Sequence, residues 1–140
     1  MAFWGVSENT IDSANRLIIP ARFRDELGVN VGLIQAPEGC LFLYSEAELE
    51  RIAEQLDADS GNPEGRSFSR EFFTRMNVVP VDRNYRIVIP ADFMEAAGLK
   101  TEVTLIGARR KIELWDREAY LAERASWEER PLSRQREIFL

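Results

Sequence analysis

The sequence predicts an α+β fold in which two copies of one unit pack around a pseudo-two-fold axis and share a β-rich barrel with short flanking helices. Three observations lead to this prediction. A segment of the chain recurs at a constant spacing of 70 residues. Each copy alternates short apolar runs typical of strands with short helical patterns. Neither unit, at roughly 45 residues, buries a sufficient hydrophobic core alone, so the two have to pack together.

The internal repeat is the strongest of these observations. The segment Ile11–Phe23 recurs as Val81–Phe93, with Asp, Arg, Ile, Pro, Ala and Phe at matching positions. The matches continue in the same order through Gly28 and Gly98 and, after a one-residue insertion, through Leu41–Ser45 and Ile112–Asp116. So many ordered matches indicate a duplicated unit, and a repeat of this kind decides how the whole fold is interpreted.

Each copy begins with a polar turn that leads into a short apolar strand. Leu17–Ile19 and Ile87–Ile89 are β-branched and apolar, which predicts buried strands. A proline follows each strand at a place where a helix can start. Gly28 and Gly98 then match the glycine that commonly stops a helix.

A hairpin and a closing helix complete each copy. The paired strands are expected at Gly32–Ala36 with Leu41–Tyr44, and at Val103–Gly107 with Lys111–Trp115. Ser45 with Glu48 forms a capping box for the first closing helix, and Asp116 caps its counterpart.

The segments outside the copies are more polar. The polar composition of Asp57–Gly65 predicts an acidic loop. Ser67 is expected to cap a short helix that carries Phe68 and Phe72. The C-terminal tail is charged but ends in Ile138-Phe139-Leu140, which suggests docking on a neighbouring molecule.

Composition excludes several classes of chemistry. The chain has no histidine and one cysteine, Cys40, so we expect no metal site, no internal disulfide, no cofactor and no catalytic site. Cys40 lies beside an apolar run and is expected to be a small buried residue. No segment resembles a signal peptide or a membrane span, which predicts a cytoplasmic protein without a membrane or small-molecule partner.

The net charge of −6 argues against nucleic-acid binding unless the charges are segregated along the chain. Acidic residues do cluster between Glu46 and Glu64, whereas the segment from Asn9 to Arg24 carries three arginines against Asp12. Arginine recognises phosphate and guanine in a bidentate manner. The charge pattern is therefore compatible with a local DNA-binding surface.

The most specific motif is Asp-x-x-x-Arg, present as Asp12 with Arg16 and as Asp82 with Arg86, and its recurrence in register makes it an architectural element of both copies. One interpretation is an ion pair that stabilises the turn. The other is that each carboxylate orients a guanidinium toward an external ligand. Two further arginines, Arg22 and Arg24, either support phosphate contacts or lie on a solvated helix face.

Taken together, these residues resemble the MraZ family of bacterial transcriptional regulators. The resemblance rests on Phe3, Gly5, the two Asp-x-x-x-Arg-x-x-x-Pro segments and Ile112–Trp115, and it covers nearly the whole chain. It implies two SpoVT-AbrB repeats folded as a swapped-hairpin barrel. On this basis the first repeat spans residues 5–51, the second spans 77–120, a linker and helix span 52–76, and a helix and tail span 121–140.

The resemblance also implies a function. Such proteins form rings and bind short G-rich direct repeats of double-stranded DNA upstream of the division and cell-wall genes, including their own gene. The expected partners are therefore promoter DNA and further copies of the chain, and the expected location is the nucleoid. Carried over, the DNA-facing arginines are Arg16 and Arg86, supported by Asp12 and Asp82.

One departure from the family pattern affects the second turn. The family often has glycine before the motif arginine, whereas this chain has Asn15 and Tyr85. Asparagine tolerates a left-handed backbone and tyrosine does so poorly. We therefore expect the second turn to differ in shape and Arg16 to contribute more to DNA binding than Arg86.

Two other functions remain open from the sequence. The same fold serves as a protein-interaction or toxin-neutralising module, with DNA binding weak or lost. An enzyme using Asp12 and Asp82 as an acid pair is the other alternative, but the sequence supplies neither a nucleophile nor a substrate pocket. DNA binding is the hypothesis that best accounts for the repeated arginines.

Overall fold

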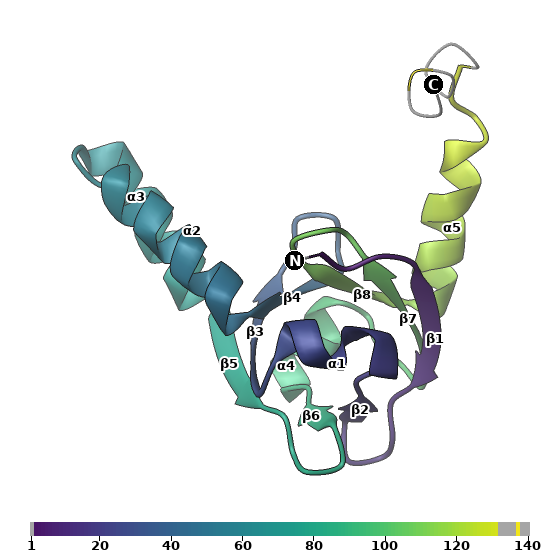
Figure 1. Ribbon diagram of the computed structural model, residues 1–140. Coiled ribbons are helices and arrows are strands. Elements are labelled where there is room, and N and C mark those ends of the chain that lie inside the picture. The colour runs from purple at the N-terminus through teal and green to yellow at the C-terminus, as the bar shows by residue number, and fades with distance from the viewer. Residues whose placement is uncertain (1, 132–136, 138–140) are drawn as a thin grey trace.

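The computed structural model describes residues 2–131 and 137 of the chain, and it runs through the same series of elements twice (Figure 1). The first series is β1 (Val6–Thr10), β2 (Arg16–Ile18), α1 (Ala21–Leu27), β3 (Asn30–Gln35), β4 (Leu41–Ser45) and α2 (Glu46–Ala58). A connecting helix, α3 (Pro63–Thr74), leads into the second series: β5 (Met76–Pro80), β6 (Arg86–Val88), α4 (Ala91–Ala96), β7 (Glu102–Gly107), β8 (Ile112–Asp116) and α5 (Arg117–Trp127). The predicted α+β class and the duplicated unit are both confirmed.

The two halves exchange their first strands. The larger sheet has six strands in the order β1-β7-β8-β4-β3-β5, and all neighbours are antiparallel. β1 therefore pairs with β7 of the second half, and β5 pairs with β3 of the first. Each half completes the sheet of the other, so neither half forms this sheet alone.

A second sheet consists of the short antiparallel ribbon β2–β6. Leu17 of the first half pairs with its repeat equivalent Ile87. At the centre of the larger sheet, Phe42 pairs with its own equivalent, Glu113. A pseudo-two-fold axis thus passes through both residue pairs and relates the two halves.

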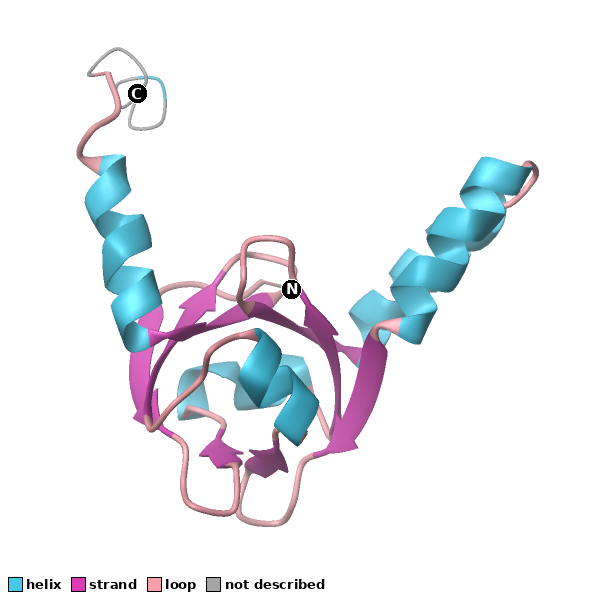
Figure 2. Cartoon of the chain, turned by 180° about the vertical axis from the view of Figure 1, so that it is seen from behind, coloured by secondary structure: helices cyan, strands magenta, loops and turns pink. Residues whose placement is uncertain are grey.

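The larger sheet arches over the two small helices, with α1 in front of α4 in the view of Figure 1, and the ribbon lies opposite the centre of the arch (Figures 1 and 2). Hydrogen bonding divides the strands of the described residues into two separate sheets. The closed barrel expected from the sequence is therefore not confirmed, although the arrangement surrounds a common core.

The hydrophobic core lies between the two sheets. Leu17, Leu43, Ile87 and Leu114 are fully buried there, together with other apolar residues from both halves. Burying each side chain of this size contributes about 1.5–3 kcal/mol, which neither half obtains without the other. The sequence prediction of fully buried ribbon strands is wrong in one respect, because Ile18 is 49% exposed. Strand residues alternate between faces, so only one face of the ribbon reaches the core.

The two closing helices, α2 and α5, begin with the capping side chains that the sequence predicts. The side chain of Ser45 accepts a hydrogen bond from Glu48 N (3.2 Å), as the capping box predicts. Asp116 caps α5 in the same way by accepting from Ala119 N (3.2 Å). α2 and α5 thus begin where the sequence predicts.

The prediction for the connecting region is wrong. α3 begins at Pro63 rather than near Ser67, and Asn62 is its cap, accepting from Gly65 N (2.8 Å). Asparagine followed by proline is a strong helix start, which shortens the expected acidic loop. The apolar C-terminal residues 138–140, for which docking was expected, lie outside the described residues.

The N-terminal segment is fixed against the edge of the hairpin β7–β8. Phe3 and Arg109 exchange backbone hydrogen bonds of 2.8 and 2.9 Å. The Phe3 side chain is buried and meets the Phe23 ring edge-on, with 5.8 Å between the centroids. The close passage of this segment depends on Gly107, because a Cβ there would collide with the backbone of Phe3 and Trp4.

We therefore expect Gly107→Ala to destabilise the protein by about 1–3 kcal/mol, because overpacking displaces the N-terminal segment and exposes Phe3. Chemical denaturation measures the free energy of unfolding. Gly61→Ala is the matched control, since a Cβ at that loop position meets nothing within 4 Å. Equal unfolding free energies for the two variants would contradict the importance of this contact.

Candidate functional site

The first Asp-x-x-x-Arg segment forms a compact turn around the carboxylate of Asp12. The Asp12 Oδ1 atom accepts hydrogen bonds from the backbone N–H of Ala14 and of Arg16, both at 2.9 Å. Its Oδ2 atom accepts from the Arg16 Nε atom at 2.7 Å. One side chain therefore fixes both the backbone of the turn and the direction of the guanidinium.

The second turn has the same geometry. Asp82 Oδ1 accepts from Asn84 N (2.8 Å) and Arg86 N (2.9 Å), and Oδ2 accepts from Arg86 Nε (3.0 Å). Tyr85 has a φ angle of 61°, against 60° for Asn15. The prediction that Tyr85 changes the shape of the second turn is therefore wrong, and the expected ranking of Arg16 above Arg86 loses its basis.

The second turn nevertheless carries backbone strain that the first largely avoids. A left-handed φ costs a side-chain-bearing residue on the order of 1–3 kcal/mol, and asparagine is among the residues that tolerate it best. The surrounding hydrogen bonds hold Tyr85 in place: its carbonyl accepts from Ile19 N (2.7 Å), just as the Asn15 carbonyl accepts from Ile89 N (2.8 Å). The local preference of tyrosine is thus overcome by the ribbon.

The electrostatics of both turns favour charged aspartates. The backbone N–H of Arg16 lowers the pKa of Asp12, partial desolvation opposes this effect, and the Arg16 guanidinium adds to the lowering. The pKa of Asp82 is lowered by the equivalent groups of Arg86, against the same opposition. Each carboxylate is therefore ionised at a lower pH than an ordinary aspartate, and in that form it orients its arginine.

The two arginines lie on one face of the ribbon. Arg16 and Ile18 of β2 are opposite Val88 and Arg86 of β6, so all of them point away from the core. The arginine side chains are 39% and 28% exposed. Within the described residues, their side-chain hydrogen bonds use Nε alone, which leaves the Nη donors for an external acceptor.

The arginine-bearing face lies far from the main acidic cluster of the chain. Both turns project side by side from the end of the molecule opposite α2 and α3 (Figures 1 and 2). The acidic cluster of the first half lies largely on α2, including Glu46, Glu48, Glu50 and Glu54. This acidic cluster therefore lies away from the arginine-bearing face.

The other two candidate arginines lie on α1 rather than on the ribbon. Arg22 donates from Nη1 to the Val6 carbonyl (3.1 Å), at the start of β1, whereas the first turn follows the end of that strand. Arg24 donates from Nε to the Ile19 carbonyl (2.8 Å), and its guanidinium carbon lies 4.0 Å from the centroid of the Tyr85 ring. Both side chains are engaged within the chain.

Sequence reasoning missed part of this surface. Arg83 lies at the exposed tip of the second turn, where the first turn has Ser13. Ile18 and Val88 form an apolar strip between the two arginines, and they are 49% and 54% exposed. The strict alternation of strand residues around buried Leu17 and Ile87 was the signal that would have placed them outside.

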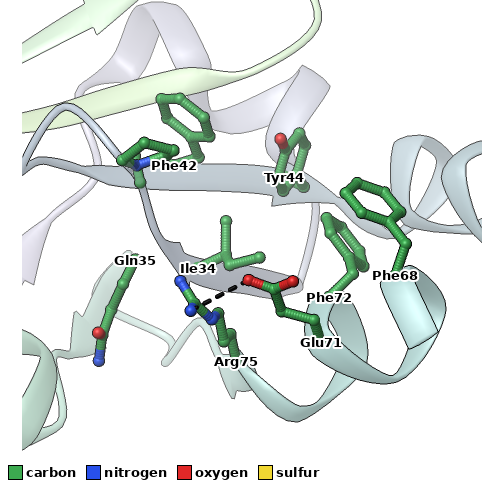
Figure 3. Close-up of a pocket in the computed structure, with 10 residues that line it drawn as sticks. Ile34, Gln35, Phe42, Tyr44, Phe68, Glu71, Phe72 and Arg75 are labelled. Carbon is green, nitrogen blue, oxygen red and sulfur yellow. Dashed lines mark ion pairs between the residues drawn. The ribbon is translucent and has the colours of Figure 1, made fainter. Parts of the chain in front are cut away.

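A different surface feature is an apolar groove between α3 and the β3–β4 hairpin, with a volume of about 210 Å³. Figure 3 shows its aromatic lining, which includes Phe42, Tyr44, Phe68 and Phe72. An ion pair between Arg75 and Glu71 (3.1 Å) crosses one side of it. The groove lies where the end of α3 meets the larger sheet, away from the two turns.

Cys40 is buried as expected, and burial raises its pKa to about 12, so its thiol stays protonated and unreactive. In the part of the chain that the structure describes, no group of three or more acidic or cysteine side chains is arranged to hold a metal ion. No described helix is both long and apolar enough to cross a bilayer.

Comparison with known proteins assigns the duplicated architecture to a family. Residues 2–71 and 72–137 each match the family model described as "MraZ protein, putative antitoxin-like". The chain belongs to the MraZ family. The two matched segments meet between α3 and β5, and together they span nearly the whole sequence.

Individual MraZ relatives agree with this assignment. A protein of Salinispora arenicola is 38% identical over 125 residues, covering 86% of this chain and 88% of its own. Relatives from Lachnoclostridium phytofermentans and Micrococcus luteus are each 36% identical, over 84% and 86% of this chain and 84% and 87% of their own. All three are named "Transcriptional regulator MraZ", which supports a role in transcription regulation.

The lowered aspartate pKa values predict a specific acid sensitivity. A carboxylate whose folded pKa lies below its unfolded value of 3.8 stabilises the fold above that value, and this stabilisation disappears as the pH falls through the folded pKa. We expect the unfolding free energy to fall less steeply in the Asp12→Asn/Asp82→Asn variant than in the parent as the pH is lowered from about 5 to about 2.

Urea denaturation at a series of pH values measures this difference. The variant Glu50→Gln/Glu54→Gln on α2 removes the same charge away from the turns and serves as the control. Parallel pH profiles for the parent and the aspartate variant would contradict the charge-assisted turn.

Proposed function

We propose that this MraZ-family chain is a sequence-specific transcriptional regulator that binds double-stranded DNA with the outer face of the β2–β6 ribbon and its two turns. The observation that carries the proposal is the pair of aspartate-oriented arginines, Arg16 and Arg86, on one face of a two-stranded antiparallel ribbon. The major groove of B-DNA admits such a ribbon, and arginine is bidentate toward guanine O6 and N7. The aspartates occupy Nε and leave the Nη atoms for this contact.

The remainder of the face fits the same partner. The exposed methyl groups of Ile18 and Val88 are suited to apolar contact with thymine methyl groups. Arg83, at the tip of the second turn, supplies a cation for the phosphate backbone. A phosphate contact remains a prediction for Arg22. For Arg24 it is one of two alternatives, the other being a contact that holds the second turn.

Assembly supports this function in an acidic chain. Repetition of one face in a ring multiplies a weak local contact along repeated DNA sites. We propose self-association because large apolar side chains are exposed, among them Trp4 (68%), Phe68 (59%) and Phe73 (44%).

The proposed targets are G-rich direct repeats upstream of the division and cell-wall genes, including the gene for this chain. The proposed location is the cytoplasm, associated with the nucleoid.

The finer fold assignment belongs to the same proposal. The exchange of β1 and β5 between halves supports a swapped-hairpin arrangement of two SpoVT-AbrB repeats. We retain residues 5–51 and 77–120 as the repeat boundaries, with 52–76 as the linker and helix and 121–140 as the terminal helix and tail.

A second candidate function is favoured by the family description, which includes the words "putative antitoxin-like". In that case the chain neutralises a protein partner, and the arginines of the two turns serve only to stabilise them. The two functions differ in what the loss of a single arginine does to DNA affinity.

We predict that Arg16→Ala and Arg86→Ala each weaken specific DNA binding by about 1–3 kcal/mol, the value of one bidentate base contact. The losses are expected to be comparable, because the two turns have equal geometry. Binding is measured with a duplex from the region upstream of the gene for this chain, in competition with unrelated DNA.

Arg110→Ala is the matched control, since it removes an arginine from the β7–β8 hairpin, away from both turns. Thermal melting is recorded for each variant. Unchanged DNA affinity together with a lowered melting temperature would support the ion-pair interpretation of the motif and favour the protein-neutralising function.

We also predict that the chain forms oligomers in solution, because exposed aromatic side chains are removed from water by self-association. Light scattering at micromolar concentration is expected to give a mass several times that of one chain. A mass equal to one chain would contradict the proposed assembly.

A further inference from the structure

The two Asp-x-x-x-Arg turns differ in the side-chain contacts that they receive from the other half of the chain. Tyr85, which precedes Arg86, has a left-handed backbone, and the guanidinium of Arg24 lies 4.0 Å from the centre of its ring. Arg24 belongs to α1 of the first half, whereas Tyr85 belongs to the second half. The contact therefore crosses between the repeats.

The arginine in this contact is itself fixed. Its Nε atom donates to the carbonyl of Ile19 (2.8 Å), and the N–H of the same Ile19 donates to the carbonyl of Tyr85 (2.7 Å). Arg24 thus reaches both the ring of Tyr85 and the residue that binds its backbone. A cation over an aromatic face is attractive, and a guanidinium stacks well in this position.

The equivalent site in the first turn lacks this arrangement. The repeat spacing of 70 places Met94 where the other half has Arg24, and Asn15 where it has Tyr85. The backbone hydrogen bond is kept, from Ile89 N to Asn15 O at 2.8 Å. Asparagine adopts φ near 60° readily, so the first turn does not need a cation to hold it.

We propose that Arg24 is a positioning residue that locks the second turn: by holding the Tyr85 ring, it keeps the strained backbone in the conformation that directs Arg86 outward. The proposal rests on the proposed DNA-binding function for its consequence, which is preorganisation of one of the two reading arginines. Preorganisation raises affinity by reducing the entropy lost on binding. The conformation of the second turn therefore depends on a contact from the other half, whereas that of the first turn follows from the backbone preference of Asn15.

The decisive experiment converts the second turn stepwise to the residue pair of the first. Arg24→Met introduces the residue of the equivalent position and removes the cation, and Tyr85→Asn then removes the need for it. With the upstream duplex as probe, we expect Arg24→Met to lower affinity roughly three- to tenfold, a part of the value of one arginine–guanine contact. The double variant Arg24→Met/Tyr85→Asn is expected to regain affinity close to that of the parent.

Measuring the effect of Arg24→Met in two other variants, Arg16→Ala and Arg86→Ala, distinguishes a positioning role of Arg24 from a direct contact with phosphate. If Arg24 acts through Arg86, Arg24→Met lowers affinity further in Arg16→Ala but not in Arg86→Ala, and the dependence on salt is unchanged. A phosphate contact would instead give the same loss in both backgrounds, reduce the salt slope by about one, and resist rescue by Tyr85→Asn. That second set of results would overturn the proposal.

A readout without DNA distinguishes failure of the lock from failure of the proposed function. Hydrogen exchange followed by mass spectrometry is expected to be faster in peptides containing Ile19 and Tyr85–Arg86 in Arg24→Met, and normal again in the double variant. Arg22→Met removes an arginine from the same helix without contacting Tyr85, and is expected to leave that exchange unchanged.

If Arg24→Met leaves the rate of hydrogen exchange in these peptides unchanged, Arg24 does not hold the second turn, and the proposal is wrong whatever the DNA measurements give. If exchange accelerates but Arg86→Ala binds DNA as the parent does, the lock is supported and the proposed DNA-binding function is the part that fails.

Discussion

The structure depends on the pairing of β2 with β6. Each strand has three residues, too few to form a stable ribbon alone, and each finds its partner in the other repeat. Leu17 and Ile87 meet at the centre of the ribbon and are fully buried, so the ribbon closes the core beneath the larger sheet. The opposite face of the same short strands carries Arg16 and Arg86. The ribbon therefore closes the core with one face and presents the two arginines with the other.

Much of the fold could be predicted because its signals are local. The repeat, the hairpins, the capping side chains of Ser45 and Asp116 and the chain reversal at Gly28 all depend on nearby residues. β1 and β5 gave no such signal. Val6–Thr10 is largely polar, and it becomes a strand because β7 supplies its hydrogen-bond partners. Strands of this kind are determined by tertiary pairing rather than by their own composition.

In the candidate site, too, the features set by nearby residues could be predicted and those set by distant contacts could not. The Asp-x-x-x-Arg spacing predicted both turns, since an aspartate that caps its own turn acts over a few residues. The effect of Tyr85 was predicted wrongly, because the hydrogen bond from Ile19 and the stacked guanidinium of Arg24 come from the other half. Neither contact is visible in the sequence around the turn. Intrinsic backbone preference was therefore overridden by neighbours more than 60 residues away along the chain.

Joining two repeats in one chain has a consequence that a dimer of identical subunits does not share. In a symmetric dimer, every substitution appears on both sides of the axis. Here the tips of the turns have diverged, with Ser13 on one side and Arg83 on the other, while the backbone around them has kept its symmetry. The face consequently has a polarity: one end carries an additional positive charge. A partner that is itself directional meets two different ends, and its two orientations on this surface are not equal in energy.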